Sequence, residues 1–210
     1  MRNWNLKKMF FVICCVSVFI CSITIAQESK KPVQNKKPVQ AANDKSVIPW
    51  HKEVRVSPKA SVIQTIGITD VVISYSSPGV KGRKIWGGLV PYDKVWRAGA
   101  NEATKITFSN DVLIEGKKLS AGSYGFFVIP REKEWTIIFN KVADQWGAFE
   151  YNESQDALRV NIVPQQGSFH EWLDYVFSDM DANPHGKNSA IVNLNWEKVK
   201  LSVKIETEVK

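Results

Sequence analysis

The chain has 210 residues and a formal net charge of +7 at pH 7. Residues 1–56 hold the whole positive excess, whereas residues 57–210 carry 18 basic and 18 acidic side chains. A protein that neutralises nucleic-acid phosphates needs a basic face on its folded domain, so the charge distribution argues against a nucleic-acid partner. All three cysteines precede residue 27, which leaves the rest of the chain without a thiol for a disulfide or a thiolate metal site.

The N-terminus has the pattern of an export signal. Basic residues precede an apolar run over residues 9–25, which ends in small residues around Ala26. This pattern predicts a signal peptide over residues 1–26, cleaved near Ala26, and a secreted protein in the periplasm or outside the cell. A retained anchor is the alternative for the same run, although a span usually needs about 20 apolar residues. Lipid attachment at Cys21 is another, although Ile20 stands where a lipoprotein signal normally has a small residue.

Residues 27–56 contain the tandem "KKPVQNKKPVQ" and little apolar periodicity. Such a segment cannot bury enough surface to offset the entropy lost on ordering. We therefore predict a disordered, Lys/Pro-rich linker. Weak attraction of its lysines to an anionic membrane is the alternative role.

From residue 57 onward, short β-branched and aromatic runs alternate with turn residues, and no helical period persists over several turns. This texture predicts one all-β domain over residues 57–210, an antiparallel β-sandwich of roughly ten strands with one long ordered loop. A flattened barrel is the alternative. The predicted strands cover residues 61–66, 71–76, 104–108, 112–114, 124–129, 135–140, 158–163, 172–177, 190–196 and 200–205.

Three stretches carry a family resemblance: "SPKASVIQTIGITDVVISYSSPGVKGRKIWGGLVPYDKVWRAGANEATKITFSNDV", "EGKKLSAGSYGFFVIP", and "WTIIFNK" followed by "WGAFEYN". They resemble the DUF2911 family of secreted bacterial proteins, found largely in Bacteroidetes, from about residue 57 to residue 205. The resemblance implies a single exported β-rich domain and no established activity. One departure is Ser77, where members of the family are expected to have Arg.

The 78–103 loop spans 26 residues, far more than a usual connection, and loops of this length are commonly functional. Its arginines could bind a carboxylate and its aromatic rings could stack on a sugar. The alternative is that Arg97 pairs internally with Glu102 or Asp93 and that the aromatic residues only pack. The candidate ligand-binding residues are Arg83, Trp86, Tyr92, Trp96, Arg97, Asn101, Glu102 and, from a second aromatic patch, Trp146.

We find no recognisable catalytic motif, metal site or cofactor fingerprint in the sequence. Ser123 in "AGSYG" is one residue out of frame for a nucleophile elbow. Residues 179–186 begin like a calcium loop but lack its glycine and its bidentate glutamate, which favours a polar hairpin. The histidines, His51, His170 and His185, lack zinc-ligand spacing and are predicted to be surface residues.

The leading functional hypothesis is a binding module that uses the 78–103 loop to contact an envelope glycan or another small ligand. A hydrolase that uses Glu102 with a second carboxylate is one alternative, since sequence cannot show whether two carboxylates converge. A structural or assembly protein of the cell envelope is the other. The sequence does not indicate an oligomeric state.

Overall fold

The computed structural model describes residues 54–208. The predicted signal peptide and all but the end of the predicted linker lie outside these residues. Among the residues described, no helix is long and apolar enough to cross a membrane.

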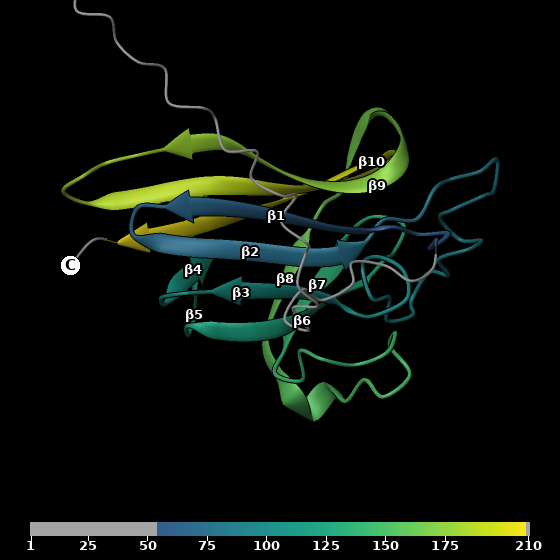
Figure 1. The fold of residues 1–210 in the computed structure, drawn as a ribbon, viewed down its shortest axis with the longest axis horizontal. Helices are drawn as coiled ribbons and strands as arrows, with labels where there is room; N and C mark the ends of the chain where they lie inside the picture. The colour runs from purple at the N-terminus through teal and green to yellow at the C-terminus, as the bar shows by residue number, and fades with distance from the viewer. Residues whose placement is uncertain (1–53, 209–210) are drawn as a thin grey trace, which may run out of the picture. The chain divides into compact units, whose positions relative to one another are not determined.

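The domain consists of two antiparallel sheets, as predicted (Figure 1). The first sheet has six strands in the order β1-β2-β3-β6-β7-β8, and the second has four in the order β5-β4-β10-β9. A 3-10 turn, η1 (Glu153–Gln155), precedes β8. The strands are β1 (Lys59–Ile66), β2 (Thr69–Ser76), β3 (Thr104–Phe108), β4 (Val112–Ile114), β5 (Lys117–Leu119), β6 (Gly122–Ile129), β7 (Trp135–Asn140), β8 (Asp156–Ile162), β9 (Gln165–Asp181) and β10 (Lys187–Glu208).

Tight turns connect the short hairpins where the turn residues predict them. Gly67, with φ 61°, begins the two-residue turn between β1 and β2. Glu115 and Gly116 join β4 to β5 with φ values of 48° and 75°, and positive φ at both positions is typical of a turn that matches strand twist. The β5 strand itself is absent from the predicted set, because three residues with two exposed lysines carry too little pattern.

The C-terminal half of the chain differs from the predicted strand boundaries. β9 is 17 residues long and β10 is 22, so the two final predicted strands are one continuous strand. The predicted break falls at Glu197, which has φ 56° and sits between two shifts in the β9–β10 register. A bulge therefore bends the strand there without ending it. The polar hairpin predicted over residues 179–186 is present, although β9 continues to Asp181 and β10 begins at Lys187.

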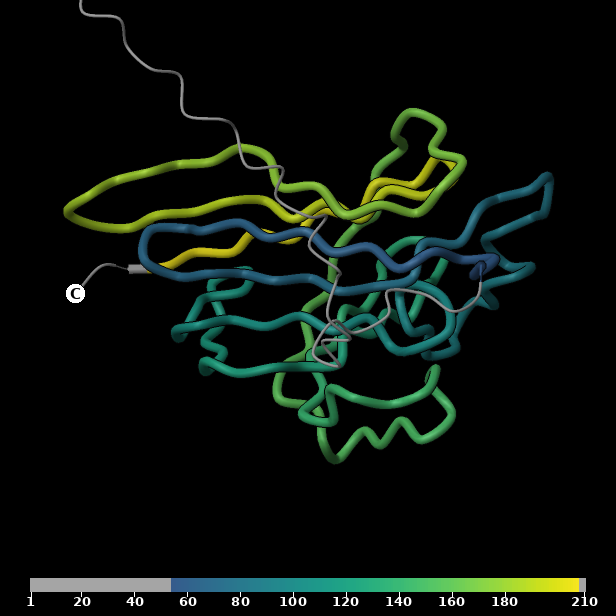
Figure 2. Tube along the Cα trace, viewed as in Figure 1, coloured from purple at the N-terminus to yellow at the C-terminus, as the bar shows by residue number. Residues whose placement is uncertain are grey.

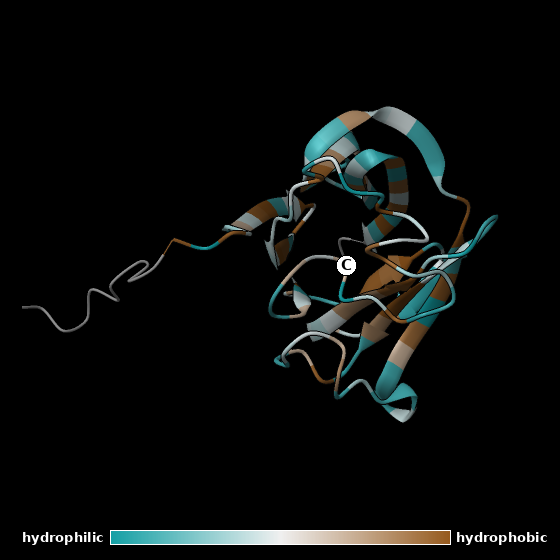
Figure 3. Ribbon diagram, turned by 90° about the vertical axis from the view of Figure 1, so that its right-hand side faces the viewer, coloured by the Kyte–Doolittle hydropathy of each residue, from teal (hydrophilic) through white to brown (hydrophobic). Residues whose placement is uncertain are grey.

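The main hydrophobic core lies between the two sheets. Hydrophobic and polar residues alternate along the strands (Figure 3). Large aromatic side chains dominate it, including Phe108, Phe139 and Trp196, each at most 1% exposed. A second, smaller cluster lies around Phe127 and Ile138, with Tyr151 packed against it. β7 is consequently buried along its whole length, so the loop after it has an apolar surface on which to rest.

The chain links the two sheets as it leaves β2. The Val80 N–H donates to the Glu171 carbonyl over 2.7 Å, and the Leu173 N–H donates to the Pro78 carbonyl over 3.0 Å. The first residues of the 78–103 loop thereby pair with β9, which is the edge strand of the second sheet. This pairing covers part of an edge that would otherwise expose unpaired backbone groups.

Candidate functional site

The 78–103 loop is ordered and gathers at the ends of the strands where β2 finishes and β3 begins (Figure 2). Buried apolar side chains anchor it in the core, among them Val80, Ile85 and Val90. Single β-bridges fasten it elsewhere: Gly79 pairs with Trp172, Trp96 with Val128, and Glu102 with Trp146. The loop is therefore a fixed part of the fold that holds its polar residues in defined positions.

Of the predicted site residues, Trp96 lies in the hydrophobic core and the partly buried Trp86 packs against it. The Trp86 ring centroid is 4.6 Å from that of Trp135 and 5.6 Å from that of Trp96. Trp196 completes the cluster, with its ring 5.8 Å from both Trp86 and Trp96. Trp96 is only 9% exposed, and its indole N–H donates to the Gly99 carbonyl. Both indoles consequently anchor the loop to the hydrophobic core.

Arg83 closes the first turn of the loop. Its Nε donates to the Val80 carbonyl over 3.1 Å, and its Nη2 donates to the Gly79 carbonyl over 2.5 Å. Two of its donors are thus committed to backbone that lies three and four residues earlier in the chain.

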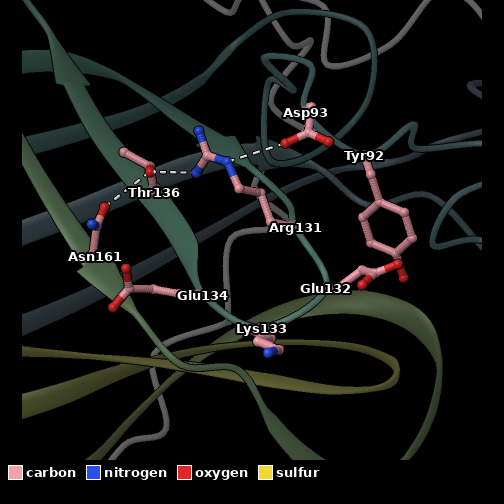
Figure 4. A pocket seen from close by; sticks show the side chains of 8 residues that line it. All are labelled: Tyr92, Asp93, Arg131, Glu132, Lys133, Glu134, Thr136 and Asn161. Carbon is pink, nitrogen blue, oxygen red and sulfur yellow. Dashed lines mark hydrogen bonds and ion pairs between the residues drawn. The ribbon is translucent and has the colours of Figure 1, made fainter.

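Tyr92 lies at a polar hollow of about 760 Å³ between the loop and the β6–β7 turn (Figure 4). Arg131 occupies one side of it, with its Nε 3.1 Å from an Asp93 carboxylate oxygen and its Nη1 donating to Thr136 over 2.7 Å. Tyr92 and Glu132 lie on the opposite side (Figure 4). The remaining lining residues are Lys133, Glu134 and Asn161. Because Arg131 already has a carboxylate partner, this hollow has no unpaired arginine to attract an anion.

Glu102 forms an ion pair with a residue far away in sequence. Both of its carboxylate oxygens accept from the Arg55 guanidinium, over 2.7 and 2.9 Å, and Lys59 Nζ lies 3.3 Å away. The hydrogen bonds from Arg55 outweigh partial burial and lower the pKa of Glu102 to about 2. Glu102 is therefore an ionised, satisfied carboxylate at neutral pH.

Arg97 pairs with neither Glu102 nor Asp93, contrary to the alternative interpretation of the sequence. Its Nη1 donates to the Asn101 carbonyl over 2.9 Å, and no carboxylate in the described part of the chain forms a salt bridge with it. Burial lowers the pKa of this guanidinium. Arg97 is thus a partly buried cation that lacks a counter-charge among residues 54–208.

An exposed aromatic ring lies beside this cation. The Arg97 guanidinium carbon lies 6.0 Å from the centroid of the Phe149 ring, and Phe149 is 81% exposed. Trp146 is 57% exposed and begins the turn that supports them. Gly147 lies between the two groups, since a Cβ there would be 3.0 Å from both Arg97 Nη1 and the Phe149 ring. We call Arg97, Trp146 and Phe149 the cation–aromatic surface.

The backbone holds the two halves of this surface together. The Gly147 N–H donates to the Asn101 carbonyl over 3.0 Å, and the Ala103 N–H donates to the Gln145 carbonyl over the same distance. Asn101 has φ 58°, a left-handed conformation that asparagine tolerates better than most residues. Trp146, the candidate from the second aromatic patch, therefore lies beside the end of the 78–103 loop.

A hydrogen-bond network between the end of β7 and the start of β8 holds the 141–155 segment, which carries Trp146 and Phe149. The Asp156 side chain is 7% exposed and accepts from Arg159 Nε over 2.7 Å and from the Tyr151 hydroxyl over 2.6 Å. Asn140 donates to its other oxygen over 2.7 Å. Burial, followed by the hydrogen bond to Asp156, raises the pKa of Tyr151 to about 12. Each strand end next to the segment thus contributes to its anchorage.

Sequence reasoning missed Arg55, because nothing in a linker-like segment indicates a partner 47 residues away. It also did not single out Phe149, because no pattern distinguishes that exposed ring from buried ones. Ser77, the departure from the family pattern, is 8% exposed, and its hydroxyl donates to the Leu173 carbonyl over 2.6 Å. The serine therefore serves here in the link between the sheets.

No group of three or more histidine, cysteine, aspartate or glutamate side chains within residues 54–208 is arranged to hold a metal ion. Comparison of the sequence with protein families gives a match over residues 57–205 to a family described as "Protein of unknown function (DUF2911)". No curated protein and no solved structure matches the chain. The match spans both sheets, the 78–103 loop and the cation–aromatic surface, and the chain belongs to the DUF2911 family.

Proposed function

We propose that this domain is a binding module, and that its cation–aromatic surface takes a ligand with an anionic group next to a flat face. The observation that carries the proposal is Arg97, a partly buried guanidinium without a carboxylate partner in the described chain, beside the exposed ring of Phe149. Export to the periplasm or cell surface, as the N-terminal sequence predicts, is part of the same proposal.

An arginine in this position is costly unless something compensates it. Removing a charged group from water without a counter-charge is unfavourable, and the single hydrogen bond to Asn101 uses one of five guanidinium donors. The two acids that the sequence offered as its partners are already engaged, Glu102 by Arg55 and Asp93 by Arg131. A carboxylate, sulfate or phosphate group of a ligand would supply the missing charge with a geometry that suits the guanidinium fork.

The exposed aromatic rings specify the rest of the ligand. Phe149 and Trp146 offer apolar faces to solvent at a place where the backbone is fixed by its bonds to Asn101 and Ala103. A sugar ring or another flat group can stack on such a face while its anionic substituent reaches Arg97. An acidic saccharide, such as a uronic acid oligomer, combines both features and fits the predicted export to an envelope rich in glycans.

The geometry gives no support to a hydrolase centred on Glu102. A general acid must hold a proton near the working pH, whereas Arg55 and Lys59 keep Glu102 ionised down to a pKa of about 2. An assembly role stays a prediction. The features relevant to it are exposed apolar side chains on the edge strand β9, namely Phe169, Trp172, Val176 and Met180.

The test is calorimetric titration of the full chain with a galacturonic acid oligosaccharide and with its methyl ester, which keeps the rings but removes the charge. We expect the acid to bind and the ester to bind at least ten-fold more weakly. Phe149→Ala and Trp146→Ala should each lower affinity about ten-fold, the equivalent of 1.4 kcal/mol. Arg97→Lys keeps the charge but loses the planar guanidinium fork, so it should lower the affinity for the acid more than the affinity for the ester.

Two control variants define the site. Ile63 is 66% exposed on β1, and Ile63→Ala should bind as the natural sequence does. Tyr92→Ala probes the polar hollow. If Tyr92→Ala lost saccharide binding while Phe149→Ala kept it, the ligand would bind in the hollow instead. Absence of binding to uronate, sialylated and sulfated saccharides at millimolar concentration would refute the proposal.

A further inference from the structure

Three side chains of β9 form a continuous hydrogen-bond chain. The Ser168 Oγ lies 3.2 Å from His170 Nε2, and His170 Nδ1 lies 2.8 Å from Asp174 Oδ2. If Nδ1 carries the ring proton and donates to the carboxylate, then Nε2 presents its lone pair to the serine hydroxyl. This is the arrangement of nucleophile, base and orienting carboxylate on which serine acyl transfer depends.

A regular strand could not make this chain. Residues four apart in a strand are about 13 Å apart, too far for a direct hydrogen bond between the side chains of His170 and Asp174. Here Asp174 pairs with Asn195 and His170 pairs with Glu197. A separation of four residues along β9 therefore lies opposite a separation of only two residues along β10. The same mismatch follows between His170 and Gln166, which pairs with Val199. Two consecutive bulges therefore bring the three side chains within reach of one another.

Bulges of this kind re-aim side chains and are over-represented next to active sites. The residue opposite His170, Glu197, has φ 56°, a left-handed conformation that is strained for a glutamate. Strained backbone at a site persists only where the surrounding structure enforces it. The β10 strand thus holds a costly conformation at the point where it supports the histidine.

Asp174 is fixed on both of its oxygens. Asn195 Nδ2 donates to Oδ1 over 2.7 Å, while Oδ2 accepts from His170. The side chains of His170 and Asp174 are 32% and 35% exposed, whereas Ser168 is exposed. A substrate can consequently reach the serine hydroxyl while the carboxylate behind it stays oriented.

We propose that Ser168, His170 and Asp174 form a nucleophilic triad that hydrolyses carboxylic esters. The Ser168 Oγ attacks the ester carbonyl, and His170 Nε2 takes the hydroxyl proton. The bond to the alcohol breaks, His170 protonates the leaving alkoxide, and an acyl-serine remains. Water then attacks the acyl-serine as His170 takes its proton and returns it to Ser168, which releases the acid.

The surroundings indicate the substrate class. Phe169 and Trp172 are 55% and 44% exposed and lie next to Ser168 and between His170 and Asp174 in the strand, so the ester is expected to carry an apolar or aromatic group. The bulges on either side of His170 interrupt the β9–β10 hydrogen-bond ladder beside Ser168. Backbone N–H groups that a bulge leaves unpaired are donors of the kind that stabilises an oxyanion. The activity is separate from ligand binding at the cation–aromatic surface.

The experiment treats the full chain with a fluorophosphonate probe, locates the label by peptide mass spectrometry, and measures hydrolysis of p-nitrophenyl acetate and butyrate. We expect the label on Ser168 and ester hydrolysis at least 100-fold above the rate without protein. Ser168→Ala and His170→Gln should reduce both to background, and Asp174→Asn should lower hydrolysis at least ten-fold.

The matched control is Ser178→Ala, because Ser178 lies on the same strand and donates to Asp179 over 2.8 Å without a histidine partner. This variant should hydrolyse the esters as fast as the natural sequence. Labelling of the natural chain is informative even if a variant misfolds. The proposal is overturned if Ser168 remains unlabelled, if Ser178 is labelled equally, or if folded Ser168→Ala keeps its hydrolysis rate.

Discussion

The ion pair between Glu102 and Arg55 predicts a specific dependence of stability on pH. We consider Glu102→Gln, which keeps the shape of the side chain and removes its charge. The pKa of Glu102 falls from 4.5 to about 2 in the fold, which corresponds to about 3 kcal/mol of free energy. Because 38% of the side chain is exposed, solvent screening reduces this figure to about 1–2 kcal/mol.

The sign of the effect follows from the lowered pKa. The ionised carboxylate stabilises the fold, so its contribution is complete above about pH 5 and is lost as the pH falls from about 4.5 towards 2. Urea unfolding of the natural sequence and of Glu102→Gln at pH 7, 5, 4 and 3 measures the difference. We expect Glu102→Gln to be less stable by about 1–2 kcal/mol at pH 7, and we expect the gap to narrow steadily below pH 5.

A double-mutant cycle identifies the partner. If Arg55 supplies the stabilising charge, Arg55→Gln and Glu102→Gln should be clearly non-additive, and 1 M salt should reduce their coupling. Equal stability of Glu102→Gln and the natural sequence at pH 7, or a gap that is the same at pH 7 and pH 3, would refute the reasoning. Additive effects of the two variants would show that the bidentate contact between Arg55 and Glu102 is not the source of the stabilisation.

Three further variants test the supports of the candidate site by urea unfolding. Gly88→Ala would place a Cβ 2.5 Å from the Lys84 carbonyl oxygen, so we expect a loss of about 2 kcal/mol, and an unchanged midpoint would contradict the loop conformation. Asp156→Asn removes the charge that holds Arg159 and should cost about 2–3 kcal/mol, an effect that should vanish if the network is only a surface contact. Gly147→Ala, at φ 68°, should cost about 1–2 kcal/mol and also weaken saccharide binding, whereas retained affinity would show that the glycine does not shape the site.

Alternation of β-branched and polar residues was sufficient to predict most of the strands. Residues 104–108, 112–114 and 135–140 are predicted with their observed bounds, because turn residues flank them and their apolar side chains face a core. Besides the missed β5, the differences lie in β9 and β10. β9 is exposed along much of its length and the hairpin bends at bulges, so the hydrophobic pattern marks only part of each strand.

Composition identified the 78–103 loop, but it could not distinguish core tryptophans from exposed aromatic residues. Trp86 and Trp146 are each followed by a glycine in the sequence, yet one packs against three other indoles and the other is 57% exposed. The partner of Glu102 was equally hidden. Arg97 is five residues away and Arg55 is 47, but the pairing of β1 with β2 brings the distant arginine to the carboxylate.

The 78–103 loop contacts both proposed sites, and this allows their roles to be separated. Gly79, near its start, pairs with Trp172 on β9, whereas Asn101, near its end, accepts from Gly147 beneath the aromatic rings. A change that displaces the whole loop, such as Gly88→Ala, should therefore weaken saccharide binding and slow ester hydrolysis together. Removal of a single exposed group should affect one alone: Phe149→Ala should spare hydrolysis, because its ring is in neither the triad nor the core. If Phe149→Ala slowed hydrolysis as strongly as it weakened binding while the fold stayed intact, the two surfaces would belong to one site that binds a saccharide ester and cleaves it.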